Sequence, residues 1–266
     1  MEAVKVFQGD WALILGASSG FGEAAAAELA RAGCNIFGVH LDRKATLPNA
    51  ERIQAEIAAA DQESVFFNIN AADPEKREEA LGRMAERAAQ PPSVRILLHS
   101  LAFGTLGRYF PEKGRAITPS QMDMTVDVMA HSLVYWVQGL LEKNLMGPGG
   151  RVFAMTSAGG RRVWSSYGPV SAAKAALESH IRQIALELAP RGITANSIQA
   201  GVTDTPALRK IPGHEQMVAN ARRNNPNGRL TDPSDVARAL VLLSQPASAW
   251  ITGNVIRIDG GEDITG

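Results

Sequence analysis

The fold is decided by the stretch Trp11-Ala12-Leu13-Ile14-Leu15-Gly16-Ala17-Ser18-Ser19-Gly20-Phe21-Gly22. Its first five residues are an apolar run of strand length, three glycines follow in the pattern GxxxGxG, and an alanine-rich helical segment continues to about residue 32. Glycines in such a loop let the backbone turn tightly and approach a pyrophosphate, whose charge is met by free amides and the positive end of the helix dipole. The stretch therefore predicts a strand, a dinucleotide-binding glycine loop and a helix.

The same alternation of strands and helices continues along the chain. Further strands are expected at residues 34–40, 64–69, 94–99, 151–155, 193–198 and 255–258, and helices at residues 48–60, 74–90, 119–144, 165–189 and 232–243. Strands that alternate with helices require parallel pairing and right-handed crossovers. We therefore expect an α/β fold over residues 1–266: a single-domain, Rossmann-like, doubly wound seven-stranded parallel sheet, with helices on both faces and the ligand at its carboxyl edge.

Two segments break the alternation. Residues 103–118 contain three glycines and a proline, and this irregular insertion is expected to shape a pocket. Residues 201–227 contain three prolines and are too long for a bare connection in a compact domain. The second segment therefore predicts a substrate-binding lid with short helices.

Composition limits the classes of function. Lysine plus arginine and aspartate plus glutamate both number 27, so the formal charge is zero, and no charge block indicates a nucleic-acid or membrane surface. Cys34 is the single cysteine, which excludes an intramolecular disulfide. Residues 1–10 lack the apolar core of a secretory signal, and no apolar run is long enough to span a bilayer. These features predict a cytoplasmic protein whose partners are small or modestly charged.

Tyr167 and Lys174 are seven residues apart at the start of the helix expected over residues 165–189. Seven steps of about 100° end about 20° short of two full turns, so both side chains lie on one face. An ammonium near a phenol stabilises the phenolate and lowers the phenol pKa, which makes Tyr167 a candidate proton donor. Taken alone, such a pair is more often packing beside a solvated charge, so the interpretation depends on the surrounding motifs.

Further motifs follow the ends of the expected strands. They are the glycine loop, Asn70 after the third strand, residues 99–104 after the fourth, Ser157 after the fifth, Lys174, residues 196–205 and Asp259-Gly260-Gly261. With these motifs at these places, the whole chain resembles the short-chain dehydrogenase/reductase family. One departure is Leu15, which stands where the glycine motif of that family usually has a threonine.

The resemblance implies a bound nicotinamide dinucleotide and a homotetramer, with the helices over residues 119–144 and 165–189 between subunits. It implies that Lys174 holds the nicotinamide-ribose hydroxyls, that Asn70 lies near the adenine, and that Thr203 or Thr205 lies near the nicotinamide amide. The residues expected to bind the cofactor are Gly16, Ser18, Ser19, Gly20, Phe21, Gly22, His40, Arg43, Lys44, Asn70, Ala71, Ser100, Leu101, Ala102, Lys174, Gly201, Thr203 and Thr205.

The form of the nicotinamide depends on the residues after the second strand. An acid there binds the ribose hydroxyls of NAD, whereas cations there pair with the 2′-phosphate of NADP. The strand ends at His40, Asp42 follows, and Arg43 with Lys44 can hold a phosphate. We favour NADPH on this basis, with NADH as the alternative. A third interpretation is that the charged residues are simply solvated loop positions and do not bind the cofactor.

The position of the tyrosine indicates a reaction. Most members of the family place a tyrosine four residues before the lysine, but Val170 stands there and Tyr167 lies three residues earlier. This spacing resembles the enoyl-acyl-carrier-protein reductases. The run His99-Ser100-Leu101-Ala102 and the pair Ala200-Gly201 also depart from the pattern of carbonyl reducers, as does Met129, which stands where those enzymes carry a relay asparagine.

The displaced tyrosine suits the chemistry of that branch. In carbonyl reduction, the carbon that takes the hydride carries the oxygen that needs a proton, whereas in enoyl-thioester reduction the charge accumulates on an oxygen two carbons farther away. A shift of three residues along a helix moves the origin of Tyr167 by about 4.5 Å, which matters for a donor that must lie within hydrogen-bond reach. Tyr167 would then stabilise the enolate oxygen, and Lys174 would position the cofactor.

Ser157 keeps a second reaction open. It lies seventeen residues before Lys174, where carbonyl reducers carry their catalytic serine, although a strand-end hydroxyl bonded to the backbone explains it equally well. Phe103 is expected to contact the substrate, and the aromatic residues expected to line an acyl pocket are Tyr109, Phe110, Tyr135 and Trp136. Aromatic residues at such density are more often ordinary core. No second histidine or acid lies at metal-ligand spacing from His99, so no metal is expected.

The sequence thus predicts a nicotinamide-dependent reductase of enoyl thioesters, acting on acyl-carrier-protein or coenzyme A esters in fatty-acid synthesis. The expected catalytic residues are Tyr167, Lys174 and Ser157, and the expected substrate contacts are Phe103, Tyr109 and Tyr167. One alternative is a short-chain oxidoreductase for a carbonyl or alcohol, such as a 3-oxoacyl or hydroxysteroid-like substrate. A second alternative is a catalytically idle cofactor-binding protein.

Overall fold

Parallel strands form one sheet at the centre of the molecule. The computed structural model describes residues 5–88 and 93–265. The strands are β1 (Trp11–Leu15), β2 (Asn35–His40), β3 (Ser64–Asn68), β4 (Val94–His99), β5 (Arg151–Thr156), β6 (Thr194–Ala200) and β7 (Val255–Ile258). They form a 7-stranded sheet in the order β3-β2-β1-β4-β5-β6-β7, and each pairing is parallel. The predicted single-domain, Rossmann-like α/β fold is confirmed.

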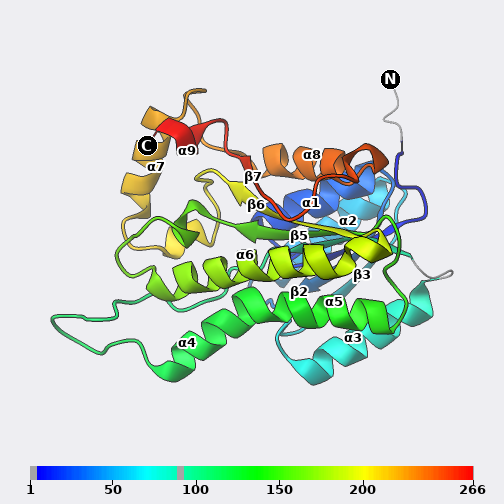
Figure 1. Cartoon of the computed structure of the whole chain (residues 1–266), viewed down its shortest axis with the longest axis horizontal. Helices are drawn as coiled ribbons and strands as arrows, with labels where there is room; N and C mark the ends of the chain where they lie inside the picture. Colours follow the sequence, from blue (N-terminus) through cyan, green and yellow to red (C-terminus); the bar gives the residue numbers. More distant parts are fainter. Residues whose placement is uncertain (1–4, 89–92, 266) are drawn as a thin grey trace.

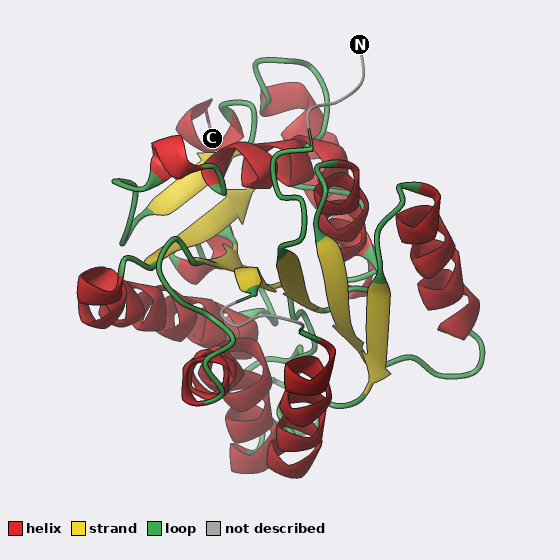
Figure 2. Cartoon of the chain, turned by 90° about the vertical axis from the view of Figure 1, so that its right-hand side faces the viewer, coloured by secondary structure: helices red, strands yellow, loops and turns green. Residues whose placement is uncertain are grey.

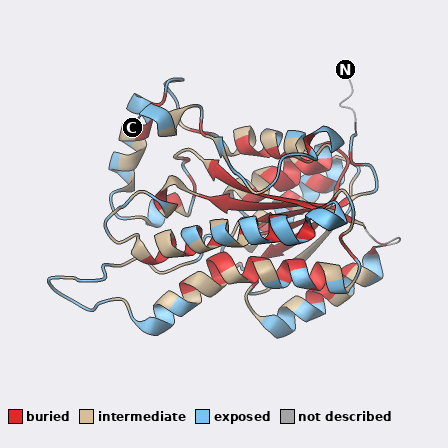
Figure 3. Cartoon of the chain, in the orientation of Figure 1, coloured by how far each residue is buried: buried red, intermediate tan, exposed pale blue. Residues whose placement is uncertain are grey.

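Helices cover both faces of this sheet (Figures 1 and 2). They are α1 (Gly20–Arg31), α2 (Leu47–Ala59), α3 (Pro74–Arg87), α4 (Pro119–Val126), α5 (Ser132–Glu142), α6 (Gly168–Leu188), α7 (His214–Asn224), α8 (Pro233–Leu243) and α9 (Glu262–Thr265). One core, which includes Leu97 and Trp136, lies between the sheet and α3, α5 and α6. The other, which includes Leu98 and Leu240, lies under α1, α2 and α8. Successive strand residues point to opposite faces, so the central strands are buried on both sides (Figure 3).

Polar side chains explain where some of these helices begin. Asp73 accepts hydrogen bonds from the backbone amides of Glu75 and Lys76 at the start of α3. Thr118 and Gln121 exchange hydrogen bonds with each other's backbone at the start of α4. Both helices carry a proline in the first turn, where its missing amide costs nothing.

The strand order reverses between β1 and β4, and a doubly wound sheet holds its ligand in the crevice at such a reversal. The loops that leave this point are tied to the sheet by backbone hydrogen bonds. The amide of Gly16 donates to the carbonyl oxygen of Val39 at 2.8 Å, and the amide of Ser100 donates to that of Leu15 at 2.8 Å. The glycine loop and the segment after β4 therefore flank the crevice.

Two helices differ from the prediction. The helix expected over residues 119–144 is interrupted by a π-helical turn, Asp127–His131, between α4 and α5. No proline or glycine marks this turn, so the sequence gives no sign of it. The helix expected from residue 165 begins at Gly168, because Ser166 adopts a φ of 64°, which a right-handed helix cannot contain. Tyr167 therefore lies just before α6 rather than inside it.

Other element ends shift by one or two residues. β2 begins at Asn35 rather than at residue 34, and β6 extends to Ala200. α3 ends at Arg87; the predicted helix end at residue 90, like residues 1–4 of the segment screened for a secretory signal, lies outside the described residues.

The two irregular segments have different shapes. Residues 201–227 contain a 3₁₀ turn, Leu208–Lys210, and the short helix α7, as the sequence predicts. Residues 103–118 form a long loop between β4 and α4 that reaches away from the sheet (Figure 1). Within the described ranges, no helix has the length and apolar character needed to cross a membrane.

Candidate functional site

The glycine loop after β1 forms a cradle that side chains would fill. Gly16 has a φ of +92°, and a Cβ built on it would lie 2.6 Å from the carbonyl oxygen of Ser100. A Cβ built on Gly22 would lie 2.0 Å from the carbonyl oxygen of Gly16. Both distances are far below a normal contact, so only glycine fits at these two positions.

The start of α1 offers free backbone amides to a ligand. Its N-cap residue, Ser19, makes no side-chain hydrogen bond to the helix, and Ser19, Gly20 and Phe21 line a cavity. The first amides of a helix have no partner within it, and the helix dipole favours an anion there. A dinucleotide pyrophosphate therefore fits this loop.

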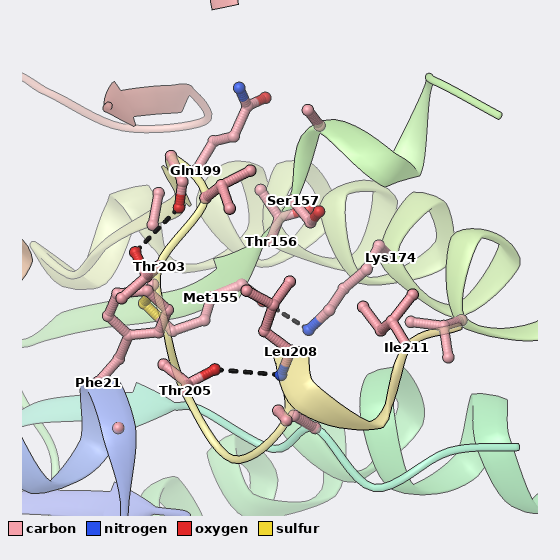
Figure 4. A pocket seen from close by; sticks show the side chains of 18 of the residues that line it. Phe21, Met155, Thr156, Ser157, Lys174, Gln199, Thr203, Thr205, Leu208 and Ile211 are labelled. Atoms are coloured by element: carbon pink, nitrogen blue, oxygen red, sulfur yellow. Dashed lines mark hydrogen bonds between the residues drawn. The ribbon is translucent and has the colours of Figure 1, made fainter. Parts of the chain in front are cut away.

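The cavity has a volume of about 260 Å³ and opens at the carboxyl edge of the sheet (Figure 4). Loops that follow β1, β4, β5 and β6 contribute to it, together with the amino-terminal half of α6. The predicted site residues that line it are Ser19, Gly20, Phe21, Ser100, Leu101, Ala102, Ser157, Tyr167, Lys174, Gly201, Thr203 and Thr205. The structure thus joins the glycine loop, the three expected catalytic residues and the start of the expected lid.

Lys174 lies at the bottom of this cavity in a buried position. Its ammonium donates a hydrogen bond of 2.6 Å to the carbonyl oxygen of Met155 on β5 (Figure 4). Burial lowers the pKa of Lys174 to about 8, and the negative charge of Glu178 opposes this shift. The ammonium is therefore fixed in direction and exchanges its proton close to neutral pH.

Tyr167 lies beside Lys174 in the cavity wall. Its ring meets that of Trp164 edge to face, with 6.2 Å between the ring centroids. Burial raises the pKa of Tyr167, and hydrogen bonding with the Ser157 side chain opposes this only in part. The expectation that Lys174 lowers the phenol pKa is wrong, because desolvation dominates and the opposing effect comes from Ser157 rather than from Lys174.

Ser157 combines the two interpretations that the sequence left open. Its hydroxyl oxygen accepts a hydrogen bond of 3.1 Å from the amide of Gly159, which is the backbone role. The residue also lines the cavity with Tyr167 and Lys174. A substrate contact by Ser157 stays a prediction.

Thr203 and Thr205 extend from β6 towards the glycine loop (Figure 4). The hydroxyl of Thr203 donates to the carbonyl oxygen of Gly201 at 3.0 Å, and that of Thr205 accepts from the amide of Leu208 at 3.2 Å. The methyl carbon of Thr205 would lie 3.4 Å from a Cβ on Gly20. These contacts fix both threonines in the cavity wall, with Thr205 next to Gly20. Their contact with the nicotinamide amide stays a prediction.

An ionised acid lies next to the glycine loop after β2. The Asp42 carboxylate is 2.8 Å from Nδ1 of the buried His40, and its side chain is only 11% exposed. Burial by itself would raise the pKa of Asp42, but hydrogen bonds from Thr46, Ser18 and His40 outweigh it and lower that pKa. The backbone of Asp42 exchanges hydrogen bonds of 2.9 and 3.0 Å with the Asn68 side chain, which fixes the acid in place.

The other predicted cofactor residues lie outside the cavity wall. Arg43 and Lys44 are exposed. Asn70 accepts from the amide of Ala72 at 3.1 Å and borders a separate shallow hollow. The carbonyl oxygen of Ala71 accepts from the indole of Trp136 at 2.9 Å. Their contact with a cofactor stays a prediction.

The structure does not bring the two expected aromatic substrate contacts into the cavity. Phe103 and Tyr109 are exposed and are not among the described residues that line it. The ring of Tyr109 instead covers Gly168, where an added Cβ would lie 2.6 Å from the ring. Their position on the loop over residues 103–118, outside the sheet crevice, could not be read from residue type alone.

The histidines do not form a metal centre with acids or cysteines. Within residues 5–88 and 93–265, no group of three potential ligands from His, Cys, Asp and Glu comes together. His99 is fully buried and bonds the hydroxyl of Ser132 at 2.9 Å. His131 and His180 contact each other at 2.9 Å between ring nitrogens.

Comparison with known proteins gives the family. The family described as "Enoyl-(Acyl carrier protein) reductase" matches residues 16–262, which is nearly the whole chain. The chain belongs to this family of short-chain dehydrogenases/reductases. It is therefore an oxidoreductase by descent, and the resemblance inferred from its motifs is confirmed.

Relatives of this short-chain dehydrogenase/reductase include enzymes named for different reactions. The enoyl-acyl-carrier-protein reductase (NADH) FabI of Synechocystis sp. is 31% identical over 175 residues; the match covers 64% of this chain and 65% of that protein, less than two thirds of its length. The NADPH-dependent aldehyde reductase-like protein of Arabidopsis thaliana is 27% identical over 94% of this chain and 93% of its own. The crystal structure of enoyl-acyl-carrier-protein reductase (NADH) from Aquifex aeolicus has a TM-score of 0.85 at 23% identity, covering 98% of this chain and 99% of that one, which shows the shared fold.

The short-chain dehydrogenase/reductase cavity also contains residues that the sequence did not indicate. They are Arg162, Trp164, Glu262 and Asp263 among others, whereas Leu208, Lys210, Ile211 and Met217 belong to residues 201–227, which the sequence predicted as a lid. Asp263 is the centre of an ion-pair cluster: its carboxylate contacts Arg161, Arg162 and Arg257, and its side chain is 3% exposed. No spacing motif links residues so far apart in the chain, so only the folded structure reveals them.

Proposed function

We propose that this protein reduces the 2,3 double bond of an enoyl thioester, carried on acyl carrier protein or coenzyme A, with NAD(P)H in fatty-acid synthesis. The observation that carries the proposal is that Tyr167, seven residues before Lys174, lies with it in the cavity beside the glycine loop. The matched family description supports the same reaction. Residues 201–227, which border this cavity, would act as its lid.

Tyr167, Lys174 and Ser157 would each have a separate role in this reaction. When bound, the reduced nicotinamide would supply a hydride to Cβ of the enoyl thioester, and a proton from water would complete the reduction at Cα. Because burial raises the pKa of Tyr167, its phenol is neutral at pH 7 and donates a hydrogen bond to the thioester oxygen, where negative charge develops. Lys174, held by Met155, presents its ammonium to the ribose hydroxyls of the cofactor. Ser157 would orient the phenol.

Arg43 and Lys44 suggest NADPH, but the geometry at the adenosine end of the site favours NADH. A 2′-phosphate beside Ser18 would meet the fixed, ionised carboxylate of Asp42, whereas ribose hydroxyls can donate hydrogen bonds to it. Arg43 and Lys44 are exposed, so water screens their attraction for a phosphate. The Synechocystis relative, named as an NADH enzyme, supports the same choice.

The proposal is tested with the purified protein and two thioesters of equal chain length. With NADH, we expect oxidation of the cofactor in the presence of a trans-2-enoyl thioester and little with the 3-oxoacyl thioester. Turnover of the 3-oxoacyl substrate alone would overturn the proposal. Binding of cofactor with no turnover of either substrate would favour the catalytically idle alternative.

Carbonyl reduction is the second candidate function because Ser157 lines the cavity seventeen residues before Lys174. A relative named as an aldehyde reductase-like protein matches over 94% of this chain. Ser157→Ala separates the two reactions. Carbonyl reduction would lose most of its rate without this hydroxyl, whereas enoyl reduction would fall less, because there Ser157 only orients the phenol of Tyr167.

We also propose that the protein is a cytoplasmic homotetramer. α4, α5 and α6 lie together on one side of the molecule (Figure 1) and present exposed apolar residues such as Tyr135 and Leu186. Light scattering on the purified protein tests the assembly, and a mass of one chain would contradict it.

A further inference from the structure

The site described above buries a positive charge almost completely. Lys174 is 6% exposed, and its ammonium has one hydrogen bond, to the carbonyl oxygen of Met155, among the described residues. Removing an ammonium from water is costly unless a negative charge or several hydrogen bonds compensate. A single neutral carbonyl does not fully do so, and the buried ammonium therefore needs an anion nearby.

Glu178 lies one helical turn after Lys174 on α6, on the same face. Its carboxylate accepts a hydrogen bond of 2.6 Å from the hydroxyl of Thr156, the residue after Met155 on β5. The cation and the anion on α6 therefore hold successive residues of the same strand. Gly160 leaves room for both: a Cβ there would lie 3.3 Å from Oε1 of Glu178 and 3.5 Å from Cβ of Lys174.

The other titratable groups near Lys174 do not compensate its charge. His99 on β4 is neutral, because burial and then the charge of Lys174 lower its pKa to about 3. The phenol of Tyr167 is also neutral, because burial raises its pKa.

The carboxylates at the far wall of the cavity have other partners. Asp263 contacts three arginines, Glu262 accepts from the amide of Val202 at 3.0 Å, and Asp259 accepts from the amide of Gly261 at 2.9 Å.

We propose that Glu178, oriented by Thr156, is the counter-charge that keeps Lys174 protonated, and with it the affinity of the protein for its cofactor at neutral pH. Glu178 does not line the cavity in the described residues, so it is a positioning residue that acts through Lys174. The inference rests on the proposed role of Lys174 in holding the cofactor ribose. It does not depend on which substrate is reduced.

The test compares Glu178→Gln and Thr156→Val with the matched control Glu187→Gln. Glu187 lies on the same helix but is exposed. The measurement is the dissociation constant of NADH between pH 6 and 10, read from nicotinamide fluorescence without substrate. Because the pKa of Lys174 is about 8, affinity in the parent protein should fall above that pH.

The Glu178→Gln protein should lose its affinity about one pH unit lower, close to the smallest effect of an adjacent opposite charge, and should bind NADH about fivefold more weakly at pH 8. Thr156→Val should move the curve in the same direction by less, and Glu187→Gln should leave it in place. A folded Glu178→Gln protein with an unshifted curve would overturn the proposal.

One further variant, Glu178→Asp, separates the role of the charge from that of the side-chain shape. Glu178→Asp retains the charge and should restore part of the shift, which a purely steric role of the side chain would not produce. If Glu178→Gln does not fold, Thr156→Val and Glu178→Asp carry the test, and curves identical to the parent in both would reject the inference. If the NADH curve shifts as expected but no enoyl thioester is reduced, the counter-charge stands and the proposed function fails.

Discussion

The ring of Tyr167 packs directly on the backbone of Gly159: a Cβ on Gly159 would lie 2.4 Å from Cε1 of the ring. The phenol therefore occupies space that any other residue at position 159 would take. Because Gly159 also donates its amide to the Ser157 hydroxyl, one short turn fixes two cavity residues relative to each other. The position of the proposed hydrogen-bond donor is thus set by the loop after β5.

Tyr167→Phe is expected to lower kcat for enoyl reduction by about 100- to 1,000-fold, the usual cost of losing one donor to a developing oxyanion. The affinity for NADH should change little, because Lys174 rather than the phenol is proposed to hold the ribose. Steady-state kinetics and nicotinamide fluorescence measure the two effects separately. Tyr135→Phe is the matched control, because Tyr135 lies on α5 under Arg77, away from the cavity. Equal losses in both variants would contradict the assigned role.

Gly22→Ala is expected to abolish dinucleotide binding, because the new Cβ would lie 2.0 Å from the carbonyl oxygen of Gly16 and the loop would have to open. Gly82→Ala on α3 is the control, since nothing lies within 4 Å of its Cβ. Alanine should even stabilise that helix by up to about 1 kcal/mol. Fluorescence titration and thermal unfolding report both. Normal NADH binding by a folded Gly22→Ala protein would rule out the cradle as the pyrophosphate site.

Asp42 is expected to decide between the two nicotinamides. Asp42→Ala removes the ionised acid beside Ser18, so the ratio of kcat/KM for NADPH to that for NADH should rise by about tenfold, the equivalent of about 1.4 kcal/mol of charge repulsion. The double variant Arg43→Ala, Lys44→Ala serves as the comparison and should leave NADH turnover unchanged. If the parent protein prefers NADPH and the double variant loses that preference, Arg43 and Lys44 bind the 2′-phosphate, as the sequence predicted.

The sequence predicted those parts of the site that follow strand ends. Ser100, Ser157 and Gly201 each come shortly after a predicted strand, and in a parallel sheet such positions converge on one edge, where all three line the cavity. Element type and order were predictable for the same reason.

Contacts between distant segments could not be predicted. Arg161 and Asp263 are 102 positions apart, and the hydrogen bond from Thr156 to Glu178 depends on how α6 sits on β5. The sign of the Tyr167 pKa shift was also inaccessible, because it depends on burial rather than on neighbours in sequence.

His99 is expected to make the fold sensitive to acid. Burial lowers its pKa to about 3, whereas the unfolded chain has the ordinary value near 6.5. Between these values the unfolded state binds a proton that the folded state does not, so the free energy of unfolding falls as the pH drops, by up to about 1.4 kcal/mol per pH unit. In urea unfolding, His99→Asn should make the free energy of unfolding less dependent on pH between about 3 and 6.5. His214→Asn, at a partly exposed site, should leave this pH dependence unchanged. The same pH dependence in His99→Asn and the parent protein would show that His99 does not cause the acid sensitivity.

Asp263 is expected to brace the cavity from the carboxyl-terminal side. Its buried carboxylate joins Arg161 and Arg162, from the loop after β5, to Arg257 on β7. A second contact comes from the same helix, α9: the hydroxyl of Thr265 donates a hydrogen bond of 2.8 Å to the carbonyl oxygen of Asn224 at the end of α7. The loop that carries Tyr167 and the segment 201–227 are therefore tied to one short helix, α9.

Asp263→Asn leaves three partly exposed arginines without their common anion, so the protein should lose about 1 kcal/mol of stability, because water screens each cation. The KM for the acyl substrate should rise several-fold, because the loop and the segment 201–227 are no longer held together, while the NADH dissociation constant stays within about twofold. Asp61→Asn is the matched control: its pair with Lys5, at 3.9 Å, is exposed and should contribute under about 1 kcal/mol. If Asp263→Asn weakens NADH binding as much as substrate binding, the brace supports the whole crevice rather than the acyl end.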